Sequence, residues 1–209
     1  MQTQPAIRTF KLRRGRVTPG QAAALARAAV PSVTDVDVPT GAVLEIGFGF
    51  GEATAELAER FPDVPIVAVD VHTPGIGRLL QEIDRRSLTN LSVVEGDARE
   101  LLSRLENNSL LGVRVFFPDP WPKVRHHKRR LVSPTFLDVV ARVVQQSGFL
   151  HVATDIDDYA EWVKANITAH SAWTAGSHAM AIDRPMTRFE QRAHTAGRTI
   201  TDIVALRSE

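Results

Sequence analysis

Three glycines at alternate positions, Gly47, Gly49 and Gly51, are the first sign of a ligand site in this sequence, and Glu45 stands just before them. Glycine lets a backbone turn tightly and approach a ligand closely. The spacing differs from the dinucleotide fingerprint, whose third glycine falls one residue later and leaves room for a pyrophosphate. A nicotinamide dehydrogenase is therefore disfavoured. A ligand-binding loop and a plain tight turn both fit the pattern.

Three aspartates follow later apolar runs in the same way. Asp70 comes about twenty residues after the glycines, where a carboxylate can accept both hydroxyls of a ribose. Asp97 either accepts from an adenine amino group or caps the helix that follows it. Asp119 lies between Pro118 and Pro120, which restrict the backbone and hold the carboxylate in place.

Positive charge is concentrated in two segments. The formal net charge is +1, but residues 1–16 and residues 123–130 each hold five lysines or arginines and no acid, which leaves −9 for the rest. The second segment begins shortly after Asp119 and contains Lys123, Arg125, His126, His127, Lys128, Arg129 and Arg130. An acidic body with two basic segments indicates a polyanionic partner, although solvated runs of surface charge have the same composition.

The composition excludes several kinds of chemistry. There is no cysteine, so disulfides, Cys-ligated zinc, iron–sulfur clusters and thiol catalysis are ruled out, which fits a reducing cytosol. The apolar runs are too short to span a bilayer, and the basic N-terminus lacks the apolar core of a signal peptide. The seven histidines have no metal-binding spacing. We therefore expect a cytoplasmic protein without a metal.

Alternating strands and helices must position these residues. After a basic arm (residues 1–18), a helix should begin at Pro19 with Thr18 as its cap and run to about Val30. Helices are further expected at 52–60, after the second strand to 86, at 99–105, at 133–146 and through Tyr159 and Trp162. Strands are expected at 42–46, 65–71, 91–94, 113–117 and 149–153.

The strands are nearly continuous apolar runs, which predicts a parallel sheet covered on both faces. Residues 172–180 and 199–206 should close it as an antiparallel pair around a loop, residues 181–198. The fold class is α/β: a single doubly wound, mostly parallel, seven-stranded, Rossmann-like domain with an antiparallel C-terminal strand. In such sheets, ligands bind beyond the carboxyl ends of the strands, where the acids described above are expected.

The glycine pattern resembles the S-adenosyl-L-methionine (AdoMet) loop of class I methyltransferases. From about Arg8 to the last strand, the chain closely resembles the bacterial tRNA (guanine-N7-)-methyltransferases. The similarity is carried by the 45–51 loop, the stretch 70–75, Pro-Asp-Pro-Trp at 118–121 with its basic continuation, Thr154-Asp155, and Thr-Arg-Phe-Glu at 187–190.

The resemblance implies methyl transfer from AdoMet to N7 of a guanine in the tRNA variable loop, with S-adenosyl-L-homocysteine as the other product. It implies AdoMet contacts from the glycine loop and from Glu45, Asp70, Asp97 and Asp119, the last also as the active-site residue. It implies substrate contacts from Lys123, Asp155, Thr187, Arg188, Phe189 and Glu190, and RNA contacts from residues 125–130.

The chemistry of that target is intelligible. Guanine N7 has an in-plane lone pair and no hydrogen, so its methylation needs positioning and no base. The purine gains positive charge as the methyl group arrives, and a fixed carboxylate nearby would stabilise that charge. Asp119 or Asp155 could also accept from guanine N1–H and the exocyclic amine. The sequence leaves the division of these roles open.

Some of these residues also have purely structural interpretations. Thr187 and Glu190 have the spacing of a capping box, and Asp155 could cap the helix that follows it. Trp121 either stacks on a nucleobase or is buried. The rings of Phe48 and Phe50 are expected to pack within the protein.

Two other functions fit parts of the pattern. Enzymes that methylate exocyclic amines of adenine or cytosine carry Asp/Asn-Pro-Pro-aromatic, whereas here a single proline separates Asp119 from Trp121. A non-catalytic tRNA-binding subunit would need neither Asp119 nor the glycines. We expect tRNA as the partner of a monomer or homodimer, with no membrane and no obligate protein partner.

Overall fold

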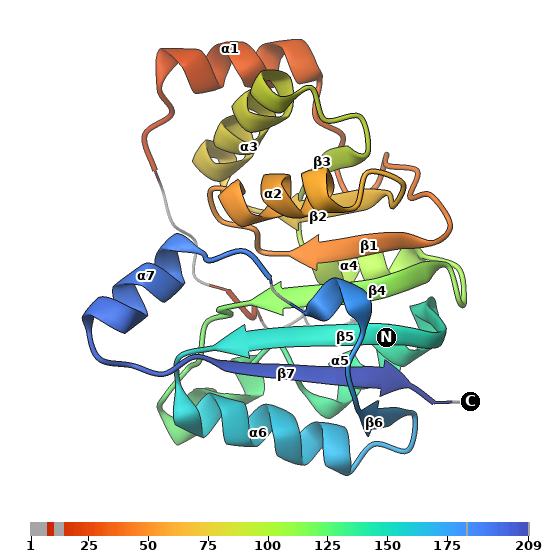
Figure 1. Ribbon diagram of the computed structural model, residues 1–209. Coiled ribbons are helices and arrows are strands. Elements are labelled where there is room, and N and C mark those ends of the chain that lie inside the picture. Colours follow the sequence, from red (N-terminus) through yellow and green to blue (C-terminus); the bar gives the residue numbers. More distant parts are fainter. Residues whose placement is uncertain (1–7, 11–14, 183, 209) are drawn as a thin grey trace, which may run out of the picture.

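A seven-stranded sheet forms the centre of the computed structural model, which describes residues 8–10, 15–182 and 184–208. The strands lie in the order β3-β2-β1-β4-β5-β7-β6 (Figure 1). They are β1 (Ala42–Ile46), β2 (Ile66–Asp70), β3 (Leu91–Glu95), β4 (Leu110–Phe116), β5 (Val144–Thr154), β6 (Trp173–Ala175) and β7 (Thr201–Arg207). The first five are parallel, and β7 runs antiparallel to both β5 and β6. The predicted mixed sheet is confirmed.

Helices cover both faces of this sheet. They are α1 (Pro19–Ala28), α2 (Glu52–Arg60), α3 (Thr73–Arg86), α4 (Ala98–Arg104), α5 (Pro134–Val143), α6 (Asp157–Thr168) and α7 (Arg188–Thr195), with 3₁₀-helices η1 (Val124–Arg129) and η2 (Ala179–Ala181). On one face, Leu44, Val113 and Val152 pack with residues of α4, α5 and α6. On the other, Ile66 and Val93 pack with residues of α1, α2 and α3. This is the layering of a doubly wound fold.

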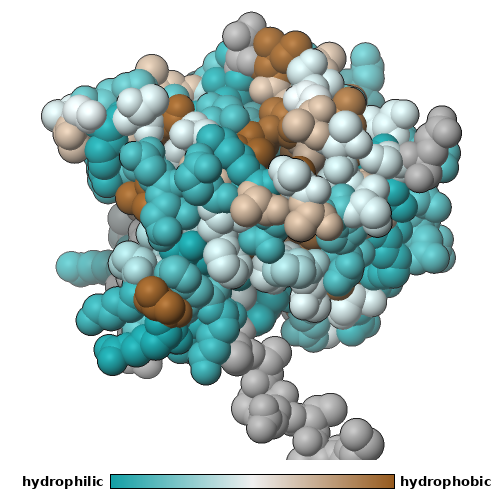
Figure 2. Space-filling view, turned by 90° about the horizontal axis from the view of Figure 1, so that it is seen from below, coloured by the Kyte–Doolittle hydropathy of each residue, from teal (hydrophilic) through white to brown (hydrophobic). Residues whose placement is uncertain are grey.

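The surface on the α6 side is dominated by hydrophilic residues (Figure 2). The reason is the periodicity of α6, which buries Tyr159, Ala160, Val163 and Ile167 in the core of the sheet and leaves its other side to solvent. The start of α1 is also as predicted, because Thr18 accepts from the backbone N–H of Gln21 and Pro19 is the first helical residue.

The boundary between α5 and β5 differs from the sequence prediction. The helix expected at 133–146 ends at Val143, and β5 begins at once with Val144. Adjacent β-branched residues favour this change to extended backbone. Gly148, expected to end the helix, instead lies inside β5, where a side chain would come within 2.5 Å of the Leu111 carbonyl oxygen. Glycine here lets β5 lie close against β4.

The C-terminal region differs as well. The strand expected at 172–180 is limited to β6, with η2 after it, and the expected loop 181–198 contains α7. Of the side chains described in α7, Ala193 is the buried one. The helix therefore has no repeating apolar stripe by which a sequence would reveal it. Its capping box, Thr187 with Glu190, is confirmed.

Candidate active site

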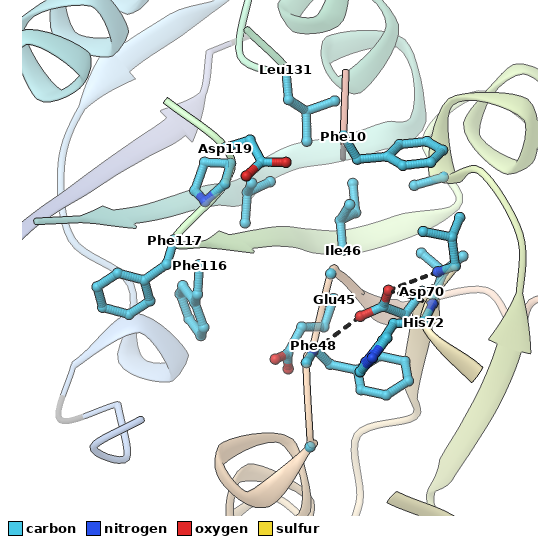
Figure 3. A pocket seen from close by; sticks show the side chains of 18 of the residues that line it. Phe10, Glu45, Ile46, Phe48, Asp70, His72, Phe116, Phe117, Asp119 and Leu131 are labelled. Atoms are coloured by element: carbon cyan, nitrogen blue, oxygen red, sulfur yellow. Dashed lines mark hydrogen bonds between the residues drawn. The ribbon is translucent and has the colours of Figure 1, made fainter. Parts of the chain in front are cut away.

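A cavity of about 230 Å³ lies at the carboxyl ends of β1 and β4. Because β1 pairs with β2 on one side and β4 on the other, this is the switch point of the sheet, where a crevice is expected. Five acids line it. Four of them lie near the carboxyl ends of four different strands, Glu45, Asp70, Asp97 and Asp119, and the fifth, Glu52, begins α2. Figure 3 shows Asp119 with Leu131 on one side of the cavity and Asp70 with His72 on the other.

The glycine loop also lines the cavity. Gly47, Gly49 and Gly51 all have positive φ angles, between 63° and 75°, which side-chain-bearing residues rarely adopt. The loop also packs tightly on α3, since a side chain on Gly75 would lie 1.9 Å from the Gly49 carbonyl oxygen. The glycine loop thus lines the cavity, while its close packing against α3 fixes its position.

Asp70 ends β2 with its carboxylate held by backbone donors. The N–H groups of Val71 and His72 donate to Oδ1 at 2.7 and 3.0 Å, and the N–H of Gly49 donates to Oδ2 at 3.0 Å (Figure 3). Burial raises the pKa of Asp70 although these hydrogen bonds oppose it. The carboxylate is therefore oriented at the cavity wall before any ligand binds.

Asp97 is both a cap and a lining residue. Its carboxylate accepts from the backbone N–H of Arg99 at the start of α4 and pairs with the Arg99 guanidinium at 2.6 Å. Burial alone would raise the pKa of Asp97, but the hydrogen bonds and charge of Arg99, with a contribution from Arg8, lower it. The carboxylate is consequently an ionised acceptor in the lining.

Glu45 is buried in β1, directly before the last residue of the strand. Its Oε1 accepts from the Thr54 hydroxyl at 3.0 Å, whereas Oε2 is buried without a hydrogen-bond partner among the described residues. Burial raises the pKa of Glu45, against the influence of the Arg114 guanidinium on the neighbouring strand. Since Glu45 also lines the cavity, the unmatched oxygen can accept from a ligand there.

Asp119 occupies a sharply bent segment after β4. The residues on either side of Pro118–Pro120, Phe117 and Trp121, have positive φ angles of 51° and 44°. Such conformations are strained for residues with side chains and concentrate at functional sites. The bend directs Asp119 into the cavity (Figure 3).

The start of α7 closes the cavity from the side of β7. Thr187 and Phe189 line it, and the Phe189 ring stacks on Phe117 with centroids 6.1 Å apart. Glu190 turns away from the lining and pairs with Arg184 at 2.6 Å. The segment 187–190 therefore caps a helix and contributes to the cavity at the same time. The side chain of Arg188 lies outside what the structure describes.

Thr9 and Phe10 form a further part of the wall that sequence reasoning missed. Thr9 and Phe10 line the cavity, and the Thr9 carbonyl oxygen accepts from the Trp121 indole N–H at 2.9 Å. The sequence signal that could have indicated this contact is Phe10, an aromatic residue within the basic arm. The arm residues Lys11, Arg13 and Arg14 lie outside the described residues.

The basic segment forms η1 beside Asp119, and its members differ in exposure. Lys123, Arg125 and Lys128 are exposed, and His126 and His127 are half-buried. Arg129 lies 4.5 Å over the ring of Trp121, which is itself buried. The basic segment therefore presents several cations to solvent, while Arg129 packs on the buried ring of Trp121.

Arg130 differs from the other expected RNA contacts, because its burial argues against a contact with RNA. It is only 2% exposed, because its guanidinium donates to the Pro120 carbonyl oxygen and pairs with Asp158. Its charge lies between the rings of Tyr159 and Trp162, 5.5 and 5.2 Å away. This arginine joins the bent segment to α6 and is not presented to solvent.

Asp155 also differs from its structural interpretation. The cap of α6 is Ile156, and the carboxylate of Asp155 pairs with Arg198 at 3.0 Å. Asp155 is not part of the cavity lining described here. Phe48 is buried as expected, but Phe50 is 39% exposed and lines the cavity, with its ring against the edge of His72.

Within residues 8–10, 15–182 and 184–208, no three histidine, aspartate or glutamate side chains form a group that could hold a metal ion. Every helix in the same part of the chain is too short or too polar to cross a membrane.

Comparison with known proteins shows which family the chain resembles. The family model described as "Putative methyltransferase" matches residues 40–203. A tRNA (guanine-N(7)-)-methyltransferase of Streptomyces avermitilis is 45% identical over 215 residues, covering 95% of this chain and 74% of that protein. The enzyme of the same name from Nitrosomonas europaea is 40% identical over 223 residues, covering 100% of each. The crystal structure of the 16S rRNA methyltransferase KamB matches with a TM-score of 0.61 at 17% identity, covering 97% of this chain and 99% of that one, and so shares the fold.

Proposed function

The chain belongs to the tRNA (guanine-N(7)-)-methyltransferase family, and we propose that its cavity binds AdoMet together with one guanine from the variable loop of a tRNA. The reaction transfers a methyl group to guanine N7 and forms 7-methylguanosine. The observation that carries the proposal is one cavity at the switch point in which the glycine loop, Asp70 and Asp97 share a lining with Asp119.

One side of the cavity fits AdoMet by the chemistry of its donors and acceptors. The oriented carboxylate of Asp70 suits the two ribose hydroxyls, and that of Asp97 suits the adenine amino group. The unpartnered buried oxygen of Glu45 suits the ammonium group of the methionine part. Bound AdoMet supplies an electrophilic methyl group on a sulfonium.

The opposite side fits the guanine. N7 needs no base, so this side must orient the purine and stabilise the charge that it gains. Asp119 is the carboxylate in the lining on that side, whereas Asp155 is paired with Arg198 and outside it. We therefore assign charge stabilisation and guanine orientation to Asp119. Phe189, 39% exposed and already stacked on Phe117, offers the purine an aromatic face.

The exposed cations of η1 extend this side of the cavity toward the tRNA backbone. Lys123, Arg125 and Lys128 follow directly on the bent segment that carries Asp119. Contacts from such cations to phosphates fix the position of the RNA and carry no sequence information. Base choice is thereby left to the cavity.

Incubation with labelled AdoMet and unmodified tRNA, followed by nucleoside analysis, tests the proposal. The expected product is 7-methylguanosine at a single variable-loop guanine. Label on an exocyclic amine of adenine or cytosine would instead support the rival methyltransferase chemistry. Tight tRNA binding without any transfer of label would support a non-catalytic subunit.

A further inference from the structure

The guanidinium of Arg184 joins two carboxylates that belong to different elements. Nε donates to Oδ1 of Asp202 and Nη1 donates to Oε2 of Glu190, both at 2.6 Å, and Nη2 makes a second bond to each acid, at 3.1 and 3.2 Å. The side chain is only 5% exposed. A planar guanidinium is suited to such double bidentate contacts, which are stronger than neutral hydrogen bonds. Arg184 thus ties the start of α7 to the start of β7.

The same guanidinium supports the aromatic wall of the cavity from behind. It lies 5.5 Å from the ring centre of Phe116 and 5.6 Å from that of Phe117. Phe117 in turn stacks on Phe189, and all three rings line the cavity, whereas Arg184 is not among the lining residues. Any action of Arg184 on a bound guanine is therefore transmitted through these side chains.

Asp202, the residue of β7 to which Arg184 bonds, is itself held in place by the neighbouring strand. Asp202 is hydrogen-bonded to Nε2 of the fully buried His151 on β5 at 2.8 Å, and His151 packs edge-on against Phe116, 4.9 Å away. The helix that Arg184 holds is mostly exposed, because Ala193 is the one side chain of α7 described as buried. Without the guanidinium, no contact among the described residues would join the carboxylate of Asp202 on β7 to that of Glu190 on α7.

We propose that Arg184 is a positioning residue for the tRNA substrate, fixing Thr187 and Phe189 in the wall where the target guanine enters. This inference rests on the proposed function. The acids assigned to AdoMet lie in or just after β1, β2 and β3, and within the described part of the chain none of them bonds to Arg184, so we expect the effect of Arg184 on the guanine side. Loss of the bridge between Arg184 and the two carboxylates is expected to affect the two ligands differently. Turnover of tRNA should decrease, while the affinity for AdoMet should not change.

The test is Arg184→Lys, which keeps the charge but cannot bond to both carboxylates in a fork. We expect kcat/KM for tRNA to fall about tenfold or more, with the Kd for AdoMet within about twofold of wild type by calorimetry. Arg142→Lys is the matched control, because Arg142 also joins elements, donating to the Leu102 and Leu105 carbonyl oxygens, and none of these residues is in the cavity lining. That control should retain both values. A parallel loss of AdoMet affinity, or wild-type kcat/KM for tRNA, would overturn the inference.

Asp202→Asn supplies a second test that stands even where Arg184→Lys does not fold. It retains the shape of the side chain and removes the charge that anchors Arg184, so it should give the same tRNA-specific loss. The double variant should be no worse than the more severe single one, since both changes break one bridge. Additive losses would contradict this. The wild-type protein in the same assay separates the two levels of inference: failure to form 7-methylguanosine refutes the proposed function, whereas an active wild type with unaffected variants refutes the role of Arg184 alone.

Discussion

Asp70 is a half-buried carboxylate whose described hydrogen bonds all come from backbone N–H groups. Three N–H groups donate to it, yet burial is the larger effect and raises its pKa. A ligand that donates hydrogen bonds to the ionised form would lower the cost of keeping this charge buried. The ionised Asp70 therefore costs the fold some stability, and a ligand that donates hydrogen bonds to it recovers part of that cost.

Asp70→Ala should accordingly weaken AdoMet binding by about tenfold or more, because the ribose hydroxyls lose a charged acceptor. Calorimetric titration measures this, with circular dichroism to establish that the variant is folded. Asp63→Ala, an exposed aspartate after α2, is the control and should bind as wild type does. Unchanged affinity in folded Asp70→Ala protein would remove Asp70 from the cofactor site.

The raised pKa of Asp70 also predicts the pH dependence of binding. If AdoMet binds the ionised carboxylate, binding must lower that pKa, and protons compete with the ligand. Affinity should therefore be constant around neutral pH and decrease as the pH falls through the pKa of the free protein, which lies above the ordinary 3.8. Titrations that start at neutral pH and go stepwise lower, as far as the protein stays folded, should show the decrease, and Asp70→Ala should make it shallower. Glu45, whose pKa burial also raises, contributes in the same direction. An affinity that rises on acidification would contradict both assignments.

Asp119 is expected to act mainly in the transition state, when the purine acquires charge. Asp119→Ala should lower the single-turnover rate on the order of a hundredfold while tRNA affinity changes much less. Asp119→Asn distinguishes charge from shape, because the amide keeps the size and an acceptor but carries no charge. If rate and affinity fall together in Asp119→Ala, the residue binds substrate and the catalytic assignment is wrong.

At the scale of elements, η1 turns a run of basic residues into two groups with different tasks. Arg129 and Arg130 are held against aromatic rings, whereas Lys123, Arg125 and Lys128 face solvent. Each phosphate contact contributes about 0.7–0.9 to the slope of log K against log salt. Replacing the three exposed cations with alanine should therefore reduce that slope by about 1–3 and leave the modified guanine unchanged.

Binding isotherms at several salt concentrations measure this slope. The matched control replaces three exposed cations on other helices, Arg27, Arg60 and Lys164, and should keep the wild-type slope. Equal slopes in wild type and in the η1 variant would mean that η1 is not the tRNA-binding surface.

Elements with a strong local signal were predictable from the sequence, and those fixed by distant contacts were not. The strand ends that bring Asp70, Asp97 and Asp119 to one edge follow from apolar runs and the rules of parallel sheets. Burial of Arg130 depends on Asp158 and on a carbonyl group of the bent segment, which no local pattern encodes. The clamp formed by Arg184 is likewise hidden, because its partners are set by the antiparallel return of β7 beside β5.

For the molecule as a whole, the cavity is an assembly of segments from nearly the entire chain. Residues 9 and 10, the ends of β1, β2 and β4, the start of α4 and the start of α7 all contribute to its lining. A ligand that touches all of these segments binds only the folded state, so it must stabilise the fold by mass action. The N-terminal segment takes part through Phe10 and the bond between Thr9 and Trp121.

AdoMet at about a hundredfold excess over its Kd should add about 2.7 kcal/mol to the free energy of unfolding. For a chain of this size, that corresponds to a rise in Tm of roughly 5–10 °C. Phe10→Ala should leave the Tm of the ligand-free protein nearly unchanged, because Phe10 belongs to none of the hydrophobic core clusters. Its rise at the same AdoMet concentration should be smaller, since the ligand loses one apolar contact in the lining. Thermal unfolding followed by calorimetry, with and without AdoMet, measures both effects. An equal rise in wild type and Phe10→Ala would show that the N-terminal segment lies beside the cofactor site without contributing to it.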